Sequence, residues 1–219
     1  MPVALAHRHA LIDRWAADSD AVVVLELAAG LSPRGFWLSG LSERLVVEVD
    51  TPEVIAAKLR LLRGTAEGRA ALTRTHWRFT GGDLRTLDLD TLVPPGQRTM
   101  VIAEGLLMYL DAEARRSLFR RIAELLTTRG GTFVADLVPP AEEPQPGLGG
   151  KLLGWLMRRA TSGVGFTQGR STRSDILAEL LAAGFGSAEA VEPQAVAATL
   201  GLPHAGTWTR MVVFRARVP

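Results

Sequence analysis

The amino-acid sequence predicts an α/β fold, built on a doubly wound and mostly parallel sheet. Short apolar runs rich in β-branched residues alternate with helical patterns along the first 138 residues. An apolar run without alternation is typical of a strand that is buried on both faces, as in parallel sheets. The length of 219 residues suits one sizeable core, so we expect a single domain over residues 1–219.

The first half of the chain supplies three predicted strands. Residues 21–27 (AVVVLEL) and 44–50 (RLVVEVD) are apolar, and residues 76–84 (HWRFTGGDL) predict a third strand with a turn at Gly81 and Gly82. A helix is expected after the loop that ends the first strand. Another begins after residue 50, where Thr51 is a suitable N-cap and Pro52 takes the first helical position.

The second half continues this pattern and then departs from it. Strands are predicted at residues 100–103 and 131–138, separated by a helix that Asp111 caps and Gly130 ends. Residues 139–150 are rich in Pro and Gly and predict a loop. A helix over residues 171–185 is ended by Gly184, and residues 209–217 predict a last strand, antiparallel and at an edge of the sheet.

Composition and charge exclude several classes of protein. Hydrophobic residues make up 47% and charged residues 22%, and the net charge is only +2, with scattered arginines, so we expect no nucleic-acid partner. The chain has no cysteine, and its four histidines lack metal-ligand spacing, so no metal site is expected. No signal peptide and no apolar run near the ~18 residues of a membrane span are present, so we expect a cytoplasmic protein without membrane contact.

Small and acidic residues stand where the predicted strands end. Ala28, Ala29 and Gly30 follow the first strand and Asp50 ends the second, while an aspartate follows the third and a glutamate ends the fourth. In doubly wound sheets a ligand binds outside these carboxyl ends. A small-residue loop lets a ligand approach the backbone, and a carboxylate after the second strand can accept hydrogen bonds from both hydroxyls of a ribose.

These features together favour an adenosine-containing cofactor. The loop is not a GxGxxG motif, so it serves the pyrophosphate of a dinucleotide less well. A cofactor with a ribose and no phosphate fits better, and S-adenosylmethionine is such a cofactor.

Four stretches resemble the leucine carboxyl methyltransferase family in order and spacing. They are ELAAGLSPRG, VVEVDTPEVIAAK, GGDLRTL and AEGLLMYL, and the resemblance covers roughly residues 8–138. The family includes polyketide O-methyltransferases of the tetracenomycin type. The resemblance implies a class I methyltransferase with a Rossmann-like, mostly parallel seven-stranded sheet whose last strand is antiparallel.

The resemblance also implies the residues that bind S-adenosylmethionine. Asp50 would hold the ribose hydroxyls, Arg8 would pair with the cofactor carboxylate, and Glu104 would lie near the methionine end. Asp83 and Leu84 would meet the adenine. The complete implied set is Arg8, Glu26, Ala28, Gly30, Asp50, Asp83, Leu84 and Glu104.

Simpler structural interpretations stay open for two of these residues. Asp50 is also suited to cap the helix that begins at Pro52, and Asp83 is also a common turn residue after two glycines.

The sequence departs from the family pattern at two places near the expected cofactor and substrate sites. Ala28 stands where members often have glycine, and the first predicted strand begins at residue 21, whereas members usually carry a longer helical segment before it.

The predicted function is that of an S-adenosylmethionine-dependent O-methyltransferase acting on a carboxylate or hydroxyl of a small, polyketide-like or other acidic molecule. A carboxylate acceptor needs no general base because it is ionised at neutral pH. A hydroxyl acceptor needs one, and Tyr109 and His204 are the candidate bases. With Glu104 they make up the catalytic candidates. Two alternatives stay open: a non-catalytic domain that binds the cofactor or a partner, and a nicotinamide-dependent oxidoreductase.

Residues 139–173 interrupt the sheet pattern and predict a lid. The stretch KLLGWLMRRA within them is amphipathic and carries too much apolar surface to leave in water. We expect it to close over cofactor and acceptor, and a contact between subunits of a homodimer is the alternative.

Overall fold

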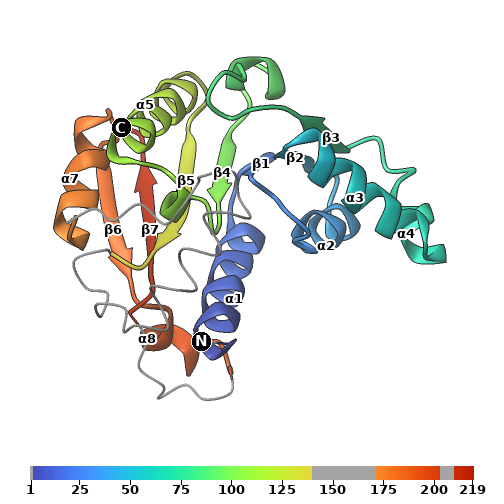
Figure 1. Ribbon diagram of the computed structural model, residues 1–219, viewed down its shortest axis with the longest axis horizontal. Coiled ribbons are helices and arrows are strands. Elements are labelled where there is room, and N and C mark those ends of the chain that lie inside the picture. The colour runs from blue at the N-terminus through green and yellow to red at the C-terminus, as the bar shows by residue number, and fades with distance from the viewer. Residues whose placement is uncertain (1, 140–170, 203–209) are drawn as a thin grey trace, which may run out of the picture.

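The computed structural model describes residues 2–139, 171–202 and 210–219, and these residues form one sheet with helices on both faces (Figure 1). The sheet order is β3-β2-β1-β4-β5-β7-β6. All pairs are parallel except those of β7, which runs antiparallel to β5 and to β6. The strands are β1 (Val23–Leu27), β2 (Leu45–Asp50), β3 (Trp77–Gly81), β4 (Thr99–Ala103), β5 (Gly131–Leu137), β6 (Ser187–Val191) and β7 (Val212–Arg217).

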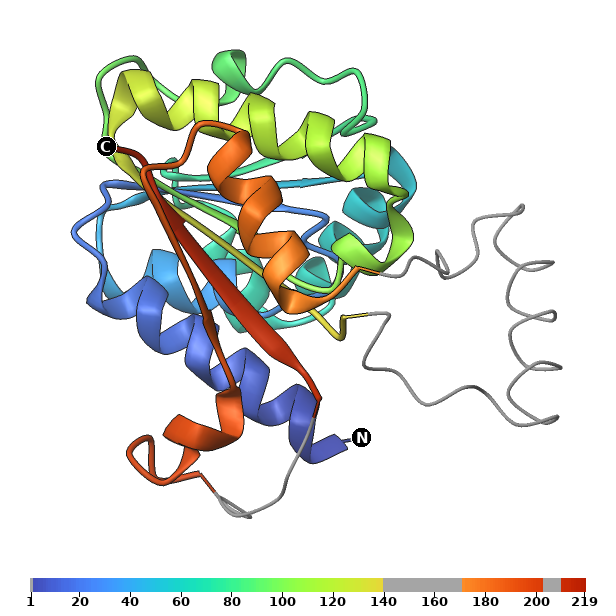
Figure 2. The same cartoon turned by 90° about the vertical axis from the view of Figure 1, so that its left-hand side faces the viewer.

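Helices cover the two faces of the sheet in separate groups. Figure 2 shows α5 and α7 on one face and α1 and α2 on the other. Each face has its own apolar core, one that includes Phe119 and Phe133 and one that includes Ile12 and Leu38. The helices are α1 (Pro2–Asp18), α2 (Arg34–Leu41), α3 (Pro52–Arg63), α4 (Ala66–Ala71), α5 (Ala112–Arg129), α7 (Arg173–Ala182) and α8 (Pro193–Ala197), with short 3₁₀ turns η1 (Leu89–Leu92) and η2 (Leu107–Tyr109).

The local signals for helix ends are confirmed in α3 and α5. Pro52 takes the first position of α3, although the Thr51 side chain makes no capping hydrogen bond. The Asp111 side chain accepts a hydrogen bond of 2.8 Å from the Ala114 amide, and Gly130 ends α5 with a φ of 71°. These ends are local properties of the chain, which is why the sequence pattern finds them.

The position of the last strand is a correction. β7 is antiparallel, as predicted, but it lies between β5 and β6 and not at the edge. Val212, Val213 and Phe214 are all buried, as expected of an interior strand. The edge belongs to β6, whose sequence SAEAV is half-buried or exposed and poor in the residues that favour strands, so no apolar run marked it.

Candidate functional site at the carboxyl ends of the strands

The strand order reverses between β1 and β4. From this pair the chain builds outward to β2 and β3 on one side and to β5 on the other. The loops that follow β1 and β4 therefore leave the same end of the sheet and diverge to opposite faces. Such a switch point is where doubly wound sheets bind their ligands.

The loop after β1 is held by Asp50 at the end of β2. One Asp50 oxygen, Oδ2, accepts a hydrogen bond of 2.7 Å from the Gly30 amide, and Oδ1 accepts one of 2.7 Å from the Thr51 amide. Ala28 and Gly30 both have a φ of +53°. A methyl group added at Gly30 would approach no atom closer than 4.0 Å, so the space over this glycine is open to a ligand.

Arg34, at the start of α2, lies at the centre of a charged cluster beside this loop. Its side chain is 0% exposed. Nε donates to Asp13 of α1 at 2.6 Å, and Nη2 donates to Glu104, just after β4, at 2.5 Å. Nη1 forms an ion pair with Glu26 of β1. One guanidinium group thus joins α1, β1 and the loop after β4.

Arg8 of α1 joins the same loop to β5. Its Nε donates to Glu104 at 2.8 Å, and its Nη1 donates to Asp136 at 2.9 Å. Asp136 is buried near the end of β5 and also accepts a hydrogen bond of 2.5 Å from the Gly105 amide. The ends of β4 and β5 are therefore tied together under α1.

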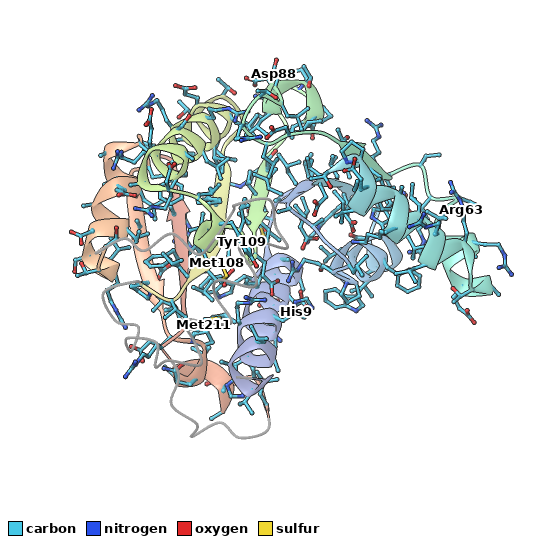
Figure 3. The ribbon with its side chains drawn as sticks, viewed as in Figure 1. His9, Arg63, Asp88, Met108, Tyr109 and Met211 are labelled. Carbon is cyan, nitrogen blue, oxygen red and sulfur yellow. The ribbon has the colours of Figure 1, made fainter. Side chains whose placement is uncertain are left out.

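His9 completes this group of charges from α1, where Figure 3 labels it. Its Nδ1 lies 3.1 Å from Glu104 Oε2, and its Nε2 lies 3.2 Å from Asp13 Oδ2. The hydrogen bond to Glu104 outweighs partial burial and raises the pKa of His9. A protonated ring donates from both nitrogens, so these two carboxylates favour the charged form. We call Arg8, His9, Asp13, Glu26, Arg34, Glu104 and Asp136 the strand-end cluster.

Carboxyl groups outnumber guanidinium groups in the strand-end cluster, by four to two. Burial opposes the ionisation of Glu104, but the hydrogen bond from His9 and the charges of Arg34 and Arg8 lower its pKa to about 2. Burial raises the pKa of Glu26 and of Asp136, although a neighbouring arginine opposes it in each case. Glu104 is therefore the carboxylate of the cluster that these contacts keep ionised, and it is suited to face a positively charged group on a ligand.

Asp83 lies where the sequence placed it, just after β3, but it shapes a turn. It accepts hydrogen bonds from the Arg85 amide at 2.9 Å and from Arg85 Nη2 at 2.6 Å, and these contacts lower its pKa to about 2. Leu84 lines a cavity of about 310 Å³, together with Leu106 and Leu110. A contact of Asp83 and Leu84 with adenine stays a prediction.

The remaining predicted residues are less clearly placed. Tyr109 lies on η2 after β4 with 42% of its surface exposed. His204 and the predicted lid, apart from its ends, lie outside the described residues. Within the described ranges, no helix has the length and apolar character needed to cross a membrane, and no group of acidic and histidine side chains is arranged to hold a metal ion.

Several members of the strand-end cluster were not predicted from the sequence. Asp136 follows the same rule that selected Asp50 and Glu104, since it lies near the carboxyl end of a predicted parallel strand. Arg34 stands out as a charge between the small-residue loop and an apolar stretch. His9 and Asp13 gave no comparable signal, because only the packing of α1 brings them to the site.

The strand order, the reversed β7 and the site at the switch point define the class I methyltransferase fold. Solved structures agree. A protein of Nostoc punctiforme, assigned as an O-methyltransferase, superposes with a TM-score of 0.63 at 15% identity, covering 98% of this chain and 56% of that one. The glycopeptide N-methyltransferase MtfA, solved with S-adenosylmethionine, gives a TM-score of 0.58 at 18% identity, covering 97% and 94%.

The chain belongs to the leucine carboxyl methyltransferase family, whose model matches residues 1–123. It is similar to the tetracenomycin polyketide synthesis O-methyltransferase TcmP of Streptomyces glaucescens, with 32% identity over 133 residues, or 59% of this chain and 45% of that protein. A Mycobacterium ulcerans protein, assigned as S-adenosylmethionine-dependent, is 44% identical over 107 residues, or 47% of this chain and 34% of that protein. The chain thus spans less than half the length of these curated relatives.

Proposed function

We propose that this chain binds S-adenosylmethionine at the carboxyl ends of β1, β2 and β4, and that it transfers the methyl group to an oxygen atom of a small molecule. The observation that carries the proposal is a pair of contacts at neighbouring strand ends. At the end of β2, Asp50 accepts a hydrogen bond from the Gly30 amide, and just after β4, Glu104 accepts one from Arg8. These are the side chains that would hold the ribose and the methionine part of the cofactor.

The residues present fit this cofactor. The space over Gly30 is open, and a carboxylate has about four acceptor positions, so Asp50 keeps acceptors for ribose hydroxyls after its two backbone bonds. The cavity beside Leu84 has mainly apolar walls, as a base would require. The ionised carboxylate of Glu104 suits the ammonium group of the cofactor.

The same features argue against a nicotinamide dinucleotide. Its pyrophosphate carries two negative charges, which the ionised carboxylate of Glu104 would repel. Close approach of a pyrophosphate also favours glycine in the first loop, and Ala28 places a methyl group there.

The chain's own residues have mainly a positioning role in the proposed reaction. When bound, the sulfonium supplies a methyl group that is already activated for in-line displacement. Arg8 would pair with the cofactor carboxylate, and Glu104, which stays ionised down to about pH 2, would face the cofactor ammonium. Alignment and exclusion of water then supply much of the rate.

Within this proposal, a carboxylate is the favoured acceptor. It is ionised at neutral pH and needs no general base, whereas a hydroxyl needs one. Of the two candidate bases, Tyr109 lies on η2, and His204 lies outside the described residues. The family description and the name of TcmP both support an oxygen acceptor for relatives of this chain.

Calorimetry tests the cofactor directly. S-adenosylhomocysteine should bind with one-to-one stoichiometry, and NAD should give no saturable heat under the same conditions. The absence of heat and of a thermal shift with millimolar S-adenosylhomocysteine would overturn the proposal.

A transfer assay tests the acceptor. Transfer of a labelled methyl group to a panel of carboxylic acids and phenols identifies the acceptor class, and binding without transfer to any of them would indicate a non-catalytic domain.

A further inference from the structure

Arg34 is a buried arginine whose donors are directed to three different elements. It contacts Asp13 of α1, Glu26 of β1 and Glu104 after β4, and its side chain is 0% exposed. Burying a charge is strongly unfavourable unless partners surround it. The three carboxylates meet this requirement, and the planar guanidinium fixes their directions because its donors form a rigid fork.

The contact with Glu104 places Arg34 next to the proposed cofactor site. Oε2 of Glu104 accepts a hydrogen bond from Arg34 Nη2, and Oε1 accepts one from Arg8 Nε. The two arginines therefore hold the carboxylate from both sides. Arg34 also holds α1 through Asp13, five positions after Arg8 in the same helix. The position of Arg8 therefore depends on Arg34 twice, through Glu104 and through α1.

We propose that Arg34 is a positioning residue, which orients Glu104 and anchors α1 so that Arg8 faces the methionine end of the cofactor. This inference rests on the proposed function, since it assigns Arg34 a role at that same site. The donors of Arg34 are directed into the carboxylates, and its Nη2 also lies 3.1 Å from His9 Nδ1, so the role we assign to Arg34 acts through these residues and not on the reacting atoms.

A second arginine offers a matched control. Arg44 also binds α1, donating from Nη1 to the Ala16 carbonyl at 2.7 Å and from Nη2 to the Ser19 carbonyl just beyond the helix at 2.7 Å. These bonds anchor the C-terminal end of α1, and their acceptors include no carboxylate of the strand-end cluster. Arg44→Gln therefore weakens the attachment of α1 without changing the surroundings of Glu104.

The first measurement is the affinity for S-adenosylhomocysteine. Arg34→Lys keeps the charge and loses the fork, so we expect roughly tenfold weaker binding or more, whereas Arg44→Gln should stay within about twofold of the unmodified chain. Equal losses in the two variants would show that Arg34 only stabilises α1 and would overturn the proposal.

The second measurement follows the His9 ring by NMR titration and does not depend on any ligand. The hydrogen bond with Glu104 is the main cause that raises the pKa of His9, so Arg34→Gln should lower the titration midpoint if Arg34 orients Glu104. Loss of the Arg34 charge alone, from a guanidinium whose Nη2 lies 3.1 Å from His9 Nδ1, would raise the midpoint instead. Arg34→Lys should shift it less, and Arg44→Gln should leave it unchanged. A midpoint that rises or stays unchanged in Arg34→Gln would show that Glu104 keeps its place without Arg34 and would overturn the proposal.

Loss of Arg34 leaves Glu26 buried without its partner, so the single variants risk unfolding. The double variant Arg34→Met with Glu26→Gln removes both charges together, and its His9 midpoint should also fall. If the unmodified chain does not bind S-adenosylhomocysteine, the proposed function fails, while the His9 titration still tests the positioning of Glu104. If the unmodified chain binds and the Arg34 and Arg44 variants behave alike, the positioning role fails alone.

Discussion

Ala28 adopts a backbone conformation that is unfavourable for every residue except glycine. Its φ of +53° lies in the left-handed region, where contact between Cβ and the backbone costs about 1–2 kcal/mol. The conformation persists because the loop around it is fixed, with the Ala29 amide bonded to the Val49 carbonyl at 3.0 Å and Gly30 bonded to Asp50. Local strain of this kind is common where a loop is shaped for a ligand.

Replacing Ala28 by glycine should therefore stabilise the protein. Relief of the strain exceeds the entropic disadvantage of glycine, so we expect the free energy of unfolding to rise by up to about 1 kcal/mol. Chemical denaturation measures the change. Ala29→Gly is the control, because Ala29 is buried without a positive φ and its replacement should destabilise. A loss of stability in both variants would contradict strain at Ala28.

Asp50 holds the Gly30 and Thr51 amides, and under the proposed function it would also hold the ribose hydroxyls. Replacement by alanine removes the acceptors for the Gly30 and Thr51 amides as well as those proposed for the ribose. We expect the free energy of unfolding to fall by about 1 kcal/mol and the binding of S-adenosylhomocysteine to weaken by about 1.5–3 kcal/mol.

Asp88 provides the comparison for Asp50. It accepts a hydrogen bond of 3.0 Å from the Asp90 amide at the start of η1, and Figure 3 shows it far from His9. Asp88→Ala should lower stability alone. If Asp50→Ala also lowers only stability, Asp50 is a cap and the ribose assignment is wrong.

At the scale of elements, the packing of α2 against the sheet depends on Gly35. A Cβ at this position would lie 1.8 Å from Glu48 Oε1 and 2.5 Å from Trp77 Nε1, so the helix approaches β2 and β3 more closely than any side chain permits. Trp77 Nε1 donates to the same Glu48 oxygen at 3.1 Å. This close approach also fixes Arg34, the residue before Gly35, at the strand-end cluster.

Gly35→Ala should destabilise the protein, even though alanine is the better helix former. Overpacking against a buried carboxylate and an indole outweighs the gain in helix propensity, and we expect a loss of about 2–3 kcal/mol. Gly40→Ala in the same helix is the control, since its Cβ would meet only the guanidinium of Arg74, at 3.3 Å. That variant should be neutral or gain up to about 1 kcal/mol, and a similar loss in both would contradict the role of close packing.

At the scale of the whole molecule, buried charge makes stability depend on pH. Burial raises the pKa of Glu48 from 4.5 to about 7, although Lys58 and the Trp77 indole oppose this shift. Between these two values the folded protein keeps a proton that the unfolded chain has lost. Stability should therefore fall as the pH rises from about 4.5 to about 7 and change little from this group above that.

Glu48→Gln should remove this dependence because glutamine does not titrate. Relative to the variant, the unmodified protein should lose up to about 3 kcal/mol of unfolding free energy between pH 5 and pH 8. Denaturation curves for both proteins at the two pH values provide the measurement. Parallel pH profiles for the two proteins would show that Glu48 does not titrate in this range.

The sequence by itself determined the alternation of strands and helices, the start of α3, both ends of α5, and the loop and carboxylates at the ends of β1, β2 and β4. Strand runs and helix caps are local signals, carried by residues a few positions apart. Parallel strands have their carboxyl ends at the same edge of the sheet, and this places Asp50, at the end of β2, near Gly30, after β1. The structure confirms it.

Only the tertiary structure decided which charges meet. Arg34 reaches Glu104 across 70 positions, and Arg8 reaches Asp136 across 128, through the packing of α1 and α2 on the sheet. The same holds for β7, whose place inside the sheet depends on β6, a strand without an apolar run. Strand order and helix packing arise from contacts between distant segments, and no local pattern of residues encodes them.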